Sequence, residues 1–114
     1  MKKTTVVLLV AVSVIFSCKK NSTSTSYTPD CTGTTPTYAA TVSALISSNC
    51  ATSGCHGAGS GEGPGALTTY TQIKNSASSI RSSIVSGSMP RNSTLTTAQK
   101  NNIVCWIDAG ATNN

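Results

Sequence analysis

Apolar side chains in the second half of the chain recur at helical spacing. Val42, Leu45 and Ile46 lie three and four residues apart along the sequence. This spacing predicts a short helix over residues 39–49, because positions three and four apart share one face of a helix. The predicted helix ends immediately before Cys50.

Three further helices are predicted beyond a glycine-rich loop. Apolar spacing predicts short helices over residues 67–75 and 77–86, the second ending at Gly87. Thr96 and Gln99 form a capping-box pair, which marks the start of the last helix. Its expected buried face comprises Ile103, Trp106, Ile107 and Gly110. No segment alternates with period two, so the pattern predicts an all-α fold of about four short helices.

The first residues have the features of an export signal. Two lysines precede an apolar run over residues 6–16, and Ser17 and Cys18 follow it. The run is far shorter than the roughly 20 residues of a membrane-spanning helix. The small residue before Cys18 resembles a bacterial lipobox, so we expect a lipoprotein-type signal peptide over residues 1–17 and a lipid-modified Cys18.

The next residues carry almost nothing apolar. Residues 18–37 are rich in serine and threonine, and we expect them to form a tether after the lipidated Cys18. The folded domain is then predicted over residues 38–114. A lipid anchor would hold it in the bacterial cell envelope, at the outer membrane or on the periplasmic face.

Composition limits both the partners and the core. Once the signal is removed, six basic side chains stand against three acids, with no basic stripe, so nucleic acid is not an expected partner. Large apolar residues are few for the length of the domain. A domain this small needs a disulfide, a metal or a large apolar ligand to be stable.

Cys50, Cys55 and His56 fall within seven residues, and His56 is the one histidine in the chain. Two cysteines followed directly by a histidine are typical of covalent haem attachment with an axial imidazole. The usual motif has two residues between the cysteines and this one has four, so the loop must bulge. Gly54, directly before Cys55, can adopt a positive φ, so the bulge requires little conformational strain. A disulfide between the two cysteines or a zinc site would use the same residues.

The five cysteines can be divided among three roles. Cys18 is the predicted lipid site, and Cys50 and Cys55 are the predicted haem attachment sites. Cys31 and Cys105 remain, and export to an oxidising compartment predicts a disulfide between them. The competing interpretation has two disulfides, the second from Cys50 to Cys55, and no cofactor.

Met89 is the one methionine other than Met1, and it follows Gly87 and precedes Pro90 between two predicted helices. Gly87 allows the backbone to approach a ring closely, and Pro90 restricts the conformation of the residue before it. A methionine in such a loop could fill a gap in the core. Its position between Gly87 and Pro90 favours Met89 as a second axial ligand to the haem iron.

The motif at residues 50–56, the Gly87-x-Met89-Pro90 loop and the closing segment 106–111 together resemble the small monohaem cytochrome c domains found in lipoproteins of Bacteroidetes-type bacteria. The resemblance covers residues 38–114. It implies a cytochrome c-like fold of about four short helices around one covalently bound haem c. Thioether bonds to Cys50 and Cys55 and axial ligation by His56 and Met89 are implied as well. The resemblance also implies that the first and last helices cross, bringing Val42 and Leu45 near Trp106 and Ile107.

Three further residues are candidates for supporting roles. In cytochromes c a backbone carbonyl after the motif, often from a proline, accepts a hydrogen bond from the second nitrogen of the axial histidine, which indicates Pro64. Arg91 and Trp106 lie near segments expected to contact the haem and have N–H groups that could donate to a propionate. The alternatives are a plain turn at Gly63-Pro64, a solvated Arg91 and a packed Trp106.

With both axial positions filled, the iron would have no open site, so the expected function is outer-sphere electron transfer rather than enzymatic catalysis. The expected partners are redox proteins of the cell envelope, together with the membrane that holds the lipid anchor. The alternative function is that of a disulfide-stabilised envelope lipoprotein without haem, acting as a binding or structural module.

Overall fold

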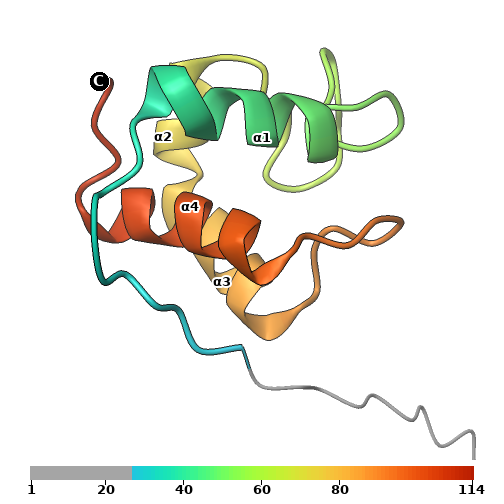
Figure 1. The fold of residues 1–114 in the computed structure, drawn as a ribbon. Coiled ribbons are helices and arrows are strands. Elements are labelled where there is room, and N and C mark those ends of the chain that lie inside the picture. The colour runs from blue at the N-terminus through green and yellow to red at the C-terminus, as the bar shows by residue number, and fades with distance from the viewer. Residues whose placement is uncertain (1–26) are drawn as a thin grey trace, which may run out of the picture.

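The computed structural model describes residues 27–114, and this part of the chain contains helices and no strand. The predicted signal peptide over residues 1–17 and the lipid site at Cys18 lie outside the described residues. Five helical segments follow one another along the chain (Figure 1): η1 (Tyr38–Val42), α1 (Ser43–Asn49), α2 (Tyr70–Asn75), α3 (Ala77–Ser86) and α4 (Thr97–Asp108). The all-α prediction is confirmed for this part of the chain.

The first predicted helix is present as two joined segments. η1 is one turn of π-helix that continues directly into α1. The Thr37 side chain caps its first turn by accepting a hydrogen bond from Ala40 N–H. The C-terminal Asn114 accepts two more, from Tyr38 N–H and Ala39 N–H, each at 2.8 Å. The end of the chain therefore lies beside the start of the first helix (Figure 1).

The prediction for the second helix is wrong at its start. α2 begins at Tyr70 rather than at residue 67, because Thr69 and Gln72 form a capping box that fixes the helix start. Leu67 instead lies in the preceding extended segment, where it is buried. The third helix, α3, has the predicted bounds and ends at Gly87, which adopts the left-handed conformation at φ +73°.

The predicted start of α4 is confirmed, and its predicted buried face is partly wrong. Thr96 and Gln99 form the expected capping box. Ile103 and Trp106 are buried, whereas Ile107 is half-buried and Gly110 lies exposed beyond the end of the helix. The other buried residues of the helix are Val104 and Cys105. The buried surface is wider than one face because η1, α3 and the segment before η1 all pack against α4.

One apolar core joins the helices. Tyr38 contributes to it from η1, with its ring centroid 5.6 Å from that of Trp106 and 5.1 Å from that of Tyr70. The expected contact between the first and last helices is made by η1, where Val42 lies, while Leu45 packs half-buried against the same core. The buried core residues are Val42, Ile46, Leu67, Ile73, Ile80, Ile84, Leu95, Ile103, Val104, Trp106 and Ala111.

Residues 27–37, the later part of the predicted tether, form a strap across α4. The structure joins Cys31 to Cys105, the predicted pair, with an S–S distance of 1.99 Å. The Tyr27 hydroxyl donates to Asn101 Oδ1 on α4. Lys100 lies over the Tyr27 ring, 5.1 Å from its centroid. The ordered domain therefore includes the strap and begins by Tyr27. Within residues 27–114, no helix combines the length and apolar character needed to cross a membrane.

Candidate functional site

The two cysteines of the motif are held by the loop that follows α1. Cys50 N–H still donates to the Ile46 carbonyl at 2.9 Å, so the helix fixes the first cysteine. His56 N–H donates back to the Cys50 carbonyl at 3.0 Å, which closes the loop and brings its two ends together. Gly54 turns the chain at φ +77° just before Cys55. The two extra residues are therefore absorbed within a closed loop.

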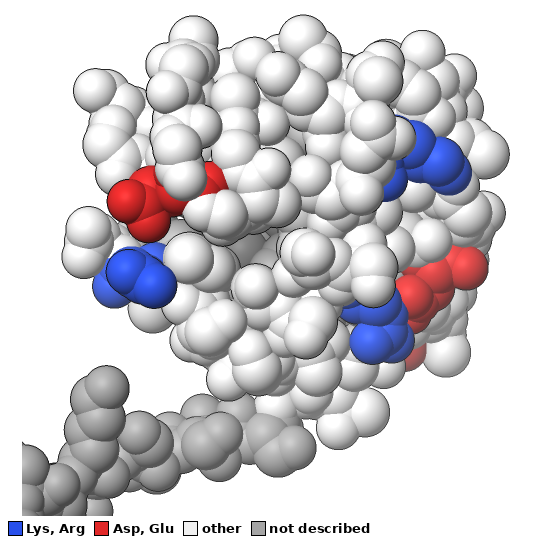
Figure 2. All heavy atoms as spheres, turned by 180° about the vertical axis from the view of Figure 1, so that it is seen from behind, with Lys and Arg blue, Asp and Glu red and all other residues white. Residues whose placement is uncertain are grey.

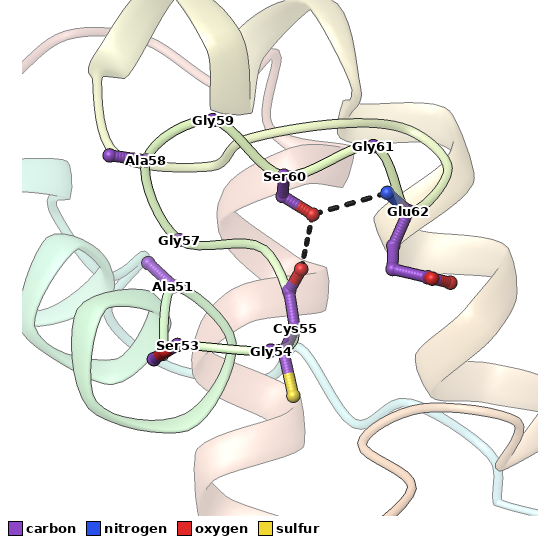
Figure 3. A pocket seen from close by; sticks show the side chains of 10 residues that line it. All are labelled: Ala51, Ser53, Gly54, Cys55, Gly57, Ala58, Gly59, Ser60, Gly61 and Glu62. Carbon is purple, nitrogen blue, oxygen red and sulfur yellow. Dashed lines mark hydrogen bonds between the residues drawn. The ribbon is translucent and has the colours of Figure 1, made fainter.

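The glycine-rich segment, residues 57–65, packs closely on this loop. Gly57 N–H donates to the Thr52 carbonyl at 3.1 Å, and a Cβ atom at position 57 would lie only 3.0 Å from that oxygen. The Ser60 hydroxyl donates to the Cys55 carbonyl and accepts from Glu62 N–H at 3.2 Å (Figure 3). The Cys55 sulfur points away from this segment (Figure 3). These contacts hold the motif loop in shape from its outer side.

His56 is buried, with 7% of its surface exposed, and one ring nitrogen has a partner. Nδ1 lies 2.9 Å from the Gly65 carbonyl. Since a carbonyl can only accept, Nδ1 carries the proton, and the neutral ring then has its lone pair on Nε2. A ring held in this way is prepared to bind a metal through Nε2.

The prediction that Pro64 supplies this carbonyl is wrong by one residue. Leu67 N–H donates to the His56 carbonyl at 2.8 Å, which lays the chain after the turn beside His56. Pro64 still lies within the turn, which is closed by a hydrogen bond from Gly65 N–H to Glu62. Gly65 is therefore the residue whose carbonyl faces the imidazole.

A cavity of about 220 Å³, here called the cysteine pocket, brings the predicted ligands together. The two cysteines and His56 line it from the motif loop, and Met89 lines it from the loop after α3. A neighbouring cavity of about 450 Å³ shares Cys55 and part of the glycine-rich segment with it. The full lining of the cysteine pocket is Asn49, Cys50, Gly54, Cys55, His56, Glu62, Met89, Pro90, Arg91 and Asn92.

Met89 is held in position by the end of α3. The left-handed Gly87 reverses the chain, and Met89 N–H then donates to the Ser83 carbonyl at 3.2 Å. The side chain is half-buried rather than packed in the core. Met89, whose thioether sulfur is a weak and polarisable ligand, is therefore a lining residue of the pocket.

Cys50 and Cys55 are both free thiols, while Cys31 and Cys105 are joined. Burial is the main cause that raises the pKa of the Cys50 thiol, and negative charge on Cys55 raises it further. The second disulfide of the competing interpretation is therefore not formed in this structure.

The two predicted propionate donors differ in their surroundings. Trp106 is only 1% exposed, and its indole N–H donates to the Thr112 carbonyl at 2.9 Å. Its one donor is used inside the core, which favours the alternative of a packed tryptophan over the predicted contact with a propionate. Arg91 is exposed and lines the cysteine pocket, and its contact with a propionate stays a prediction.

Sequence reasoning missed two residues of this site, Gly65 and Glu62. Gly65 directly follows Gly63-Pro64, a pair typical of turns. A turn there could have indicated that the carbonyl of the next residue faces His56. Glu62 is the one acid in the glycine-rich segment, and its placement on the pocket rim depends on the path of the loop. The zinc interpretation needed a further ligand near the motif. Among residues 27–114 there is no group of three or more His, Cys, Asp or Glu side chains that could hold a metal ion.

No protein-family model matches this chain, and the curated proteins and solved structures searched contain no match to it.

Proposed function

We propose that this chain is a small c-type cytochrome that carries electrons, with one haem bound covalently through Cys50 and Cys55. The observation that carries the proposal is the cysteine pocket: two free thiols, a buried imidazole and a methionine line one cavity. His56 and Met89 would be the axial ligands. The helical fold is compatible with a cytochrome c-like domain.

The chemistry of the donor set fits a haem. Thiols can form thioether bonds, His56 offers Nε2 because Gly65 holds Nδ1, and a methionine sulfur stands at the same cavity. When bound, the group would supply a one-electron iron couple. His56 and Met89 would hold the metal.

The size of the pocket implies that one loop moves. Its volume of about 220 Å³ is below the roughly 300–1,000 Å³ of most ligand sites. Met89 lies on an exposed loop without helical structure, whereas His56 is fixed by hydrogen bonds on both sides. We therefore expect the Met89 loop to stand further out in the haem-loaded protein.

The setting of the protein is part of the same proposal. The signal-like residues 1–17 and the lipobox-like Cys18 support export and lipid anchoring in the cell envelope. Redox proteins of the envelope would then supply and accept the electrons. Since both axial positions would be filled, the chain would be an electron carrier and not an enzyme.

A visible spectrum of exported protein, made in cells that attach haem c, tests the proposal. The reduced protein should have a sharp α band at the c-type position, and the haem should stay with the protein in acidified acetone. A variant lacking both thiols, Cys50→Ala with Cys55→Ala, should lose covalent haem. Cys31→Ser should keep it, because Cys31 lies on the strap outside the pocket lining.

Colourless, folded wild-type protein from competent cells would end the haem proposal. If the same protein contained a Cys50–Cys55 disulfide by mass spectrometry, the alternative of a haem-free binding or structural lipoprotein would replace it.

A further inference from the structure

A second cavity lies between the strap and α4, away from the proposed haem site. Its volume is about 230 Å³, and it shares no lining residue with the cysteine pocket. The disulfide between Cys31 and Cys105 borders it and holds its two walls together. We call this cavity the strap slot. The polar residues that line it are Asp30, Thr32, Thr34 and Thr35 on the strap and Asn101 and Asn102 on α4.

The polar side chains of the strap slot are only partly used within the protein. Asn101 Oδ1 accepts a hydrogen bond from Asp30 N–H at 3.2 Å, which leaves the two N–H donors of the same amide for another partner. Asn102 is half-buried, and its amide makes no hydrogen bond within residues 27–114. The exposed hydroxyls of Thr34 and Thr35 are also without a partner in that range. Amides and hydroxyls both donate and accept, so the slot can bind a ligand that carries several hydroxyl groups.

Asp30 is the one charged residue that lines the slot. Its Oδ1 accepts hydrogen bonds from the N–H and the hydroxyl of Thr32, at 3.0 and 2.8 Å. These hydrogen bonds lower the pKa of Asp30, so the carboxylate is ionised at neutral pH. The slot therefore combines neutral hydrogen-bonding groups with a single negative charge, which favours a ligand with one positive charge.

The lining of the slot is unsuited to other classes of ligand. An anion would meet a carboxylate and no lysine or arginine. A divalent cation needs several oxygen ligands, usually including more than one carboxylate, and no three His, Cys, Asp or Glu side chains gather anywhere in residues 27–114. On the face shown in Figure 2, charged side chains form a few small groups separated by uncharged surface, so a highly charged macromolecule finds no extended patch there. The volume of about 230 Å³ is below the roughly 300–1,000 Å³ of most ligand sites, so the occupant is small.

We propose that the strap slot binds one sugar ring that carries a protonated amine, as a hexosamine does. The ring hydroxyls exchange hydrogen bonds with Asn101, Asn102 and the two threonines, and the amine lies against the Asp30 carboxylate. Binding is non-covalent. It goes beyond the proposed electron transfer and does not depend on it, because the slot and the cysteine pocket have no residue in common.

NMR titration of the purified protein with glucosamine tests the proposal. At about pH 6 the amine of the sugar is protonated and Asp30 is ionised. Glucosamine should shift the amide signals of the strap and the side-chain signals of Asn101 and Asn102, with a dissociation constant of about 1 mM for so small a ligand. Glucose, which has a hydroxyl in place of the amine, should bind about threefold more weakly, because an exposed ion pair contributes modestly. Added salt should reduce this difference.

Three variants separate the contributions of charge and hydrogen bonding. Asp30→Asn should bind glucosamine and glucose equally, because the amide oxygen can still accept from Thr32 but has no charge. Asn102→Ala should weaken the binding of both sugars about fivefold, since one hydrogen-bonding side chain is lost. Asn75→Ala, at an exposed asparagine at the end of α2, is the matched control and should change neither affinity. Circular dichroism of each variant verifies that it is folded.

Three results would overturn the inference. Folded wild-type protein whose slot signals do not move in a large excess of glucosamine has no sugar site there. Affinities that fall in Asn75→Ala as much as in Asn102→Ala would place the binding outside the slot. A preference for glucosamine that persists in Asp30→Asn would reject the carboxylate as the partner of the amine. Each of these results would leave the proposed haem site intact, since that site uses other residues.

Discussion

The His56 ring has different surroundings at its two nitrogens. The Gly65 carbonyl accepts a hydrogen bond from Nδ1–H, with the two atoms 2.9 Å apart, and the ring lies in the wall of the cysteine pocket. Hydrogen bonding at one nitrogen fixes the tautomer and the orientation of the other. Since the acceptor is a backbone atom, it is set by the path of the chain and is insensitive to most side-chain substitutions.

Met89→Ala tests the second proposed ligand. In the haem-loaded, oxidised protein this change should abolish the weak sulfur-to-iron charge-transfer band, because alanine has no atom to bind the metal. The reduction potential should also fall, since methionine ligation raises it. The neighbouring Ser88→Ala should keep both properties. Persistence of the band in Met89→Ala would exclude Met89 as the ligand.

Gly57→Ala tests how tightly the glycine-rich segment packs on the motif loop. A Cβ atom at position 57 would lie 3.0 Å from the Thr52 carbonyl, so the loop must shift. We expect the free energy of unfolding to fall by about 1–3 kcal/mol in urea titrations. Gly61→Ala is the control, because no atom lies within 4 Å of its added carbon. Equal losses in both variants would contradict close packing at Gly57.

The Cys50 thiol should make the haem-free protein sensitive to alkaline pH. Burial raises the pKa of Cys50 above its ordinary value of 9.0, so the folded state keeps the proton that the unfolded chain releases. The stability linked to this proton is therefore fully present below the unfolded pKa and is lost as the pH rises from there through the higher folded pKa. Urea titrations from about pH 8 to about pH 10 should show this loss. Cys50→Ala should flatten it, and an unchanged profile would refute the assignment.

Helix starts are the best-defined features at the scale of single elements. The capping boxes at Thr69 and Thr96 stop both helices from extending upstream, because each threonine adopts an extended backbone conformation while its side chain binds the first turn. The second of these caps was evident from the sequence. The first was overlooked because the apolar Leu67 extended the helical spacing past it, although Leu67 belongs to the segment that pairs with His56.

Thr96→Ala should lower the free energy of unfolding by about 1 kcal/mol, because the N–H of Gln99 loses its side-chain acceptor. Thermal or urea unfolding followed by circular dichroism measures the change. Thr97→Ala is the matched control, since Thr97 is exposed and is the first residue of α4 itself. A comparable loss in Thr97→Ala would show that the cap is not the cause.

At the scale of the whole molecule, one covalent link joins the strap to α4. Cys31 and Cys105 are 74 residues apart in the sequence, so their bond restricts a long loop of the unfolded chain. Cys31→Ser should lower the free energy of unfolding by about 4 kcal/mol in the chain-entropy account. Cys31 itself is exposed, so the substitution removes little besides the link.

Thr34→Ser, at another exposed strap position, serves as the control for this change. Its free energy of unfolding should match that of the wild type. A small loss in Cys31→Ser would mean that the strap's other contacts, including the hydrogen bond from Tyr27 to Asn101, hold it without the disulfide.

The helices and the ligand candidates could be predicted from the sequence because their signals are local. Apolar spacing and caps define α3 and α4, and the motif and the lone methionine define the ligand candidates. The structure gathers Cys50, Cys55, His56 and Met89 at one pocket, and their haem roles stay predictions.

The wrong predictions concern features that depend on contacts between residues far apart in the sequence. The Trp106 indole N–H donates to the Thr112 carbonyl because the C-terminal segment folds back over the end of α4. The choice of Gly65 over Pro64 depends on the path of the turn after the glycine-rich segment. The disulfide of the strap was predicted from the cysteine count, whereas the hydrogen bond from Tyr27 to Asn101 on α4 has no local signal in the sequence.

The burial of Trp106 gives the protein an internal optical reporter. It is the one tryptophan in the chain, it is 1% exposed, and it lies at the junction of η1 and α4. Its emission should shift to longer wavelength when the junction opens to water. If the domain unfolds as one unit, that shift and the loss of helical ellipticity should follow the same curve. A strap that detached first would leave the emission unchanged while the Tyr27 environment altered, so fluorescence would distinguish loosening of the surface from collapse of the core.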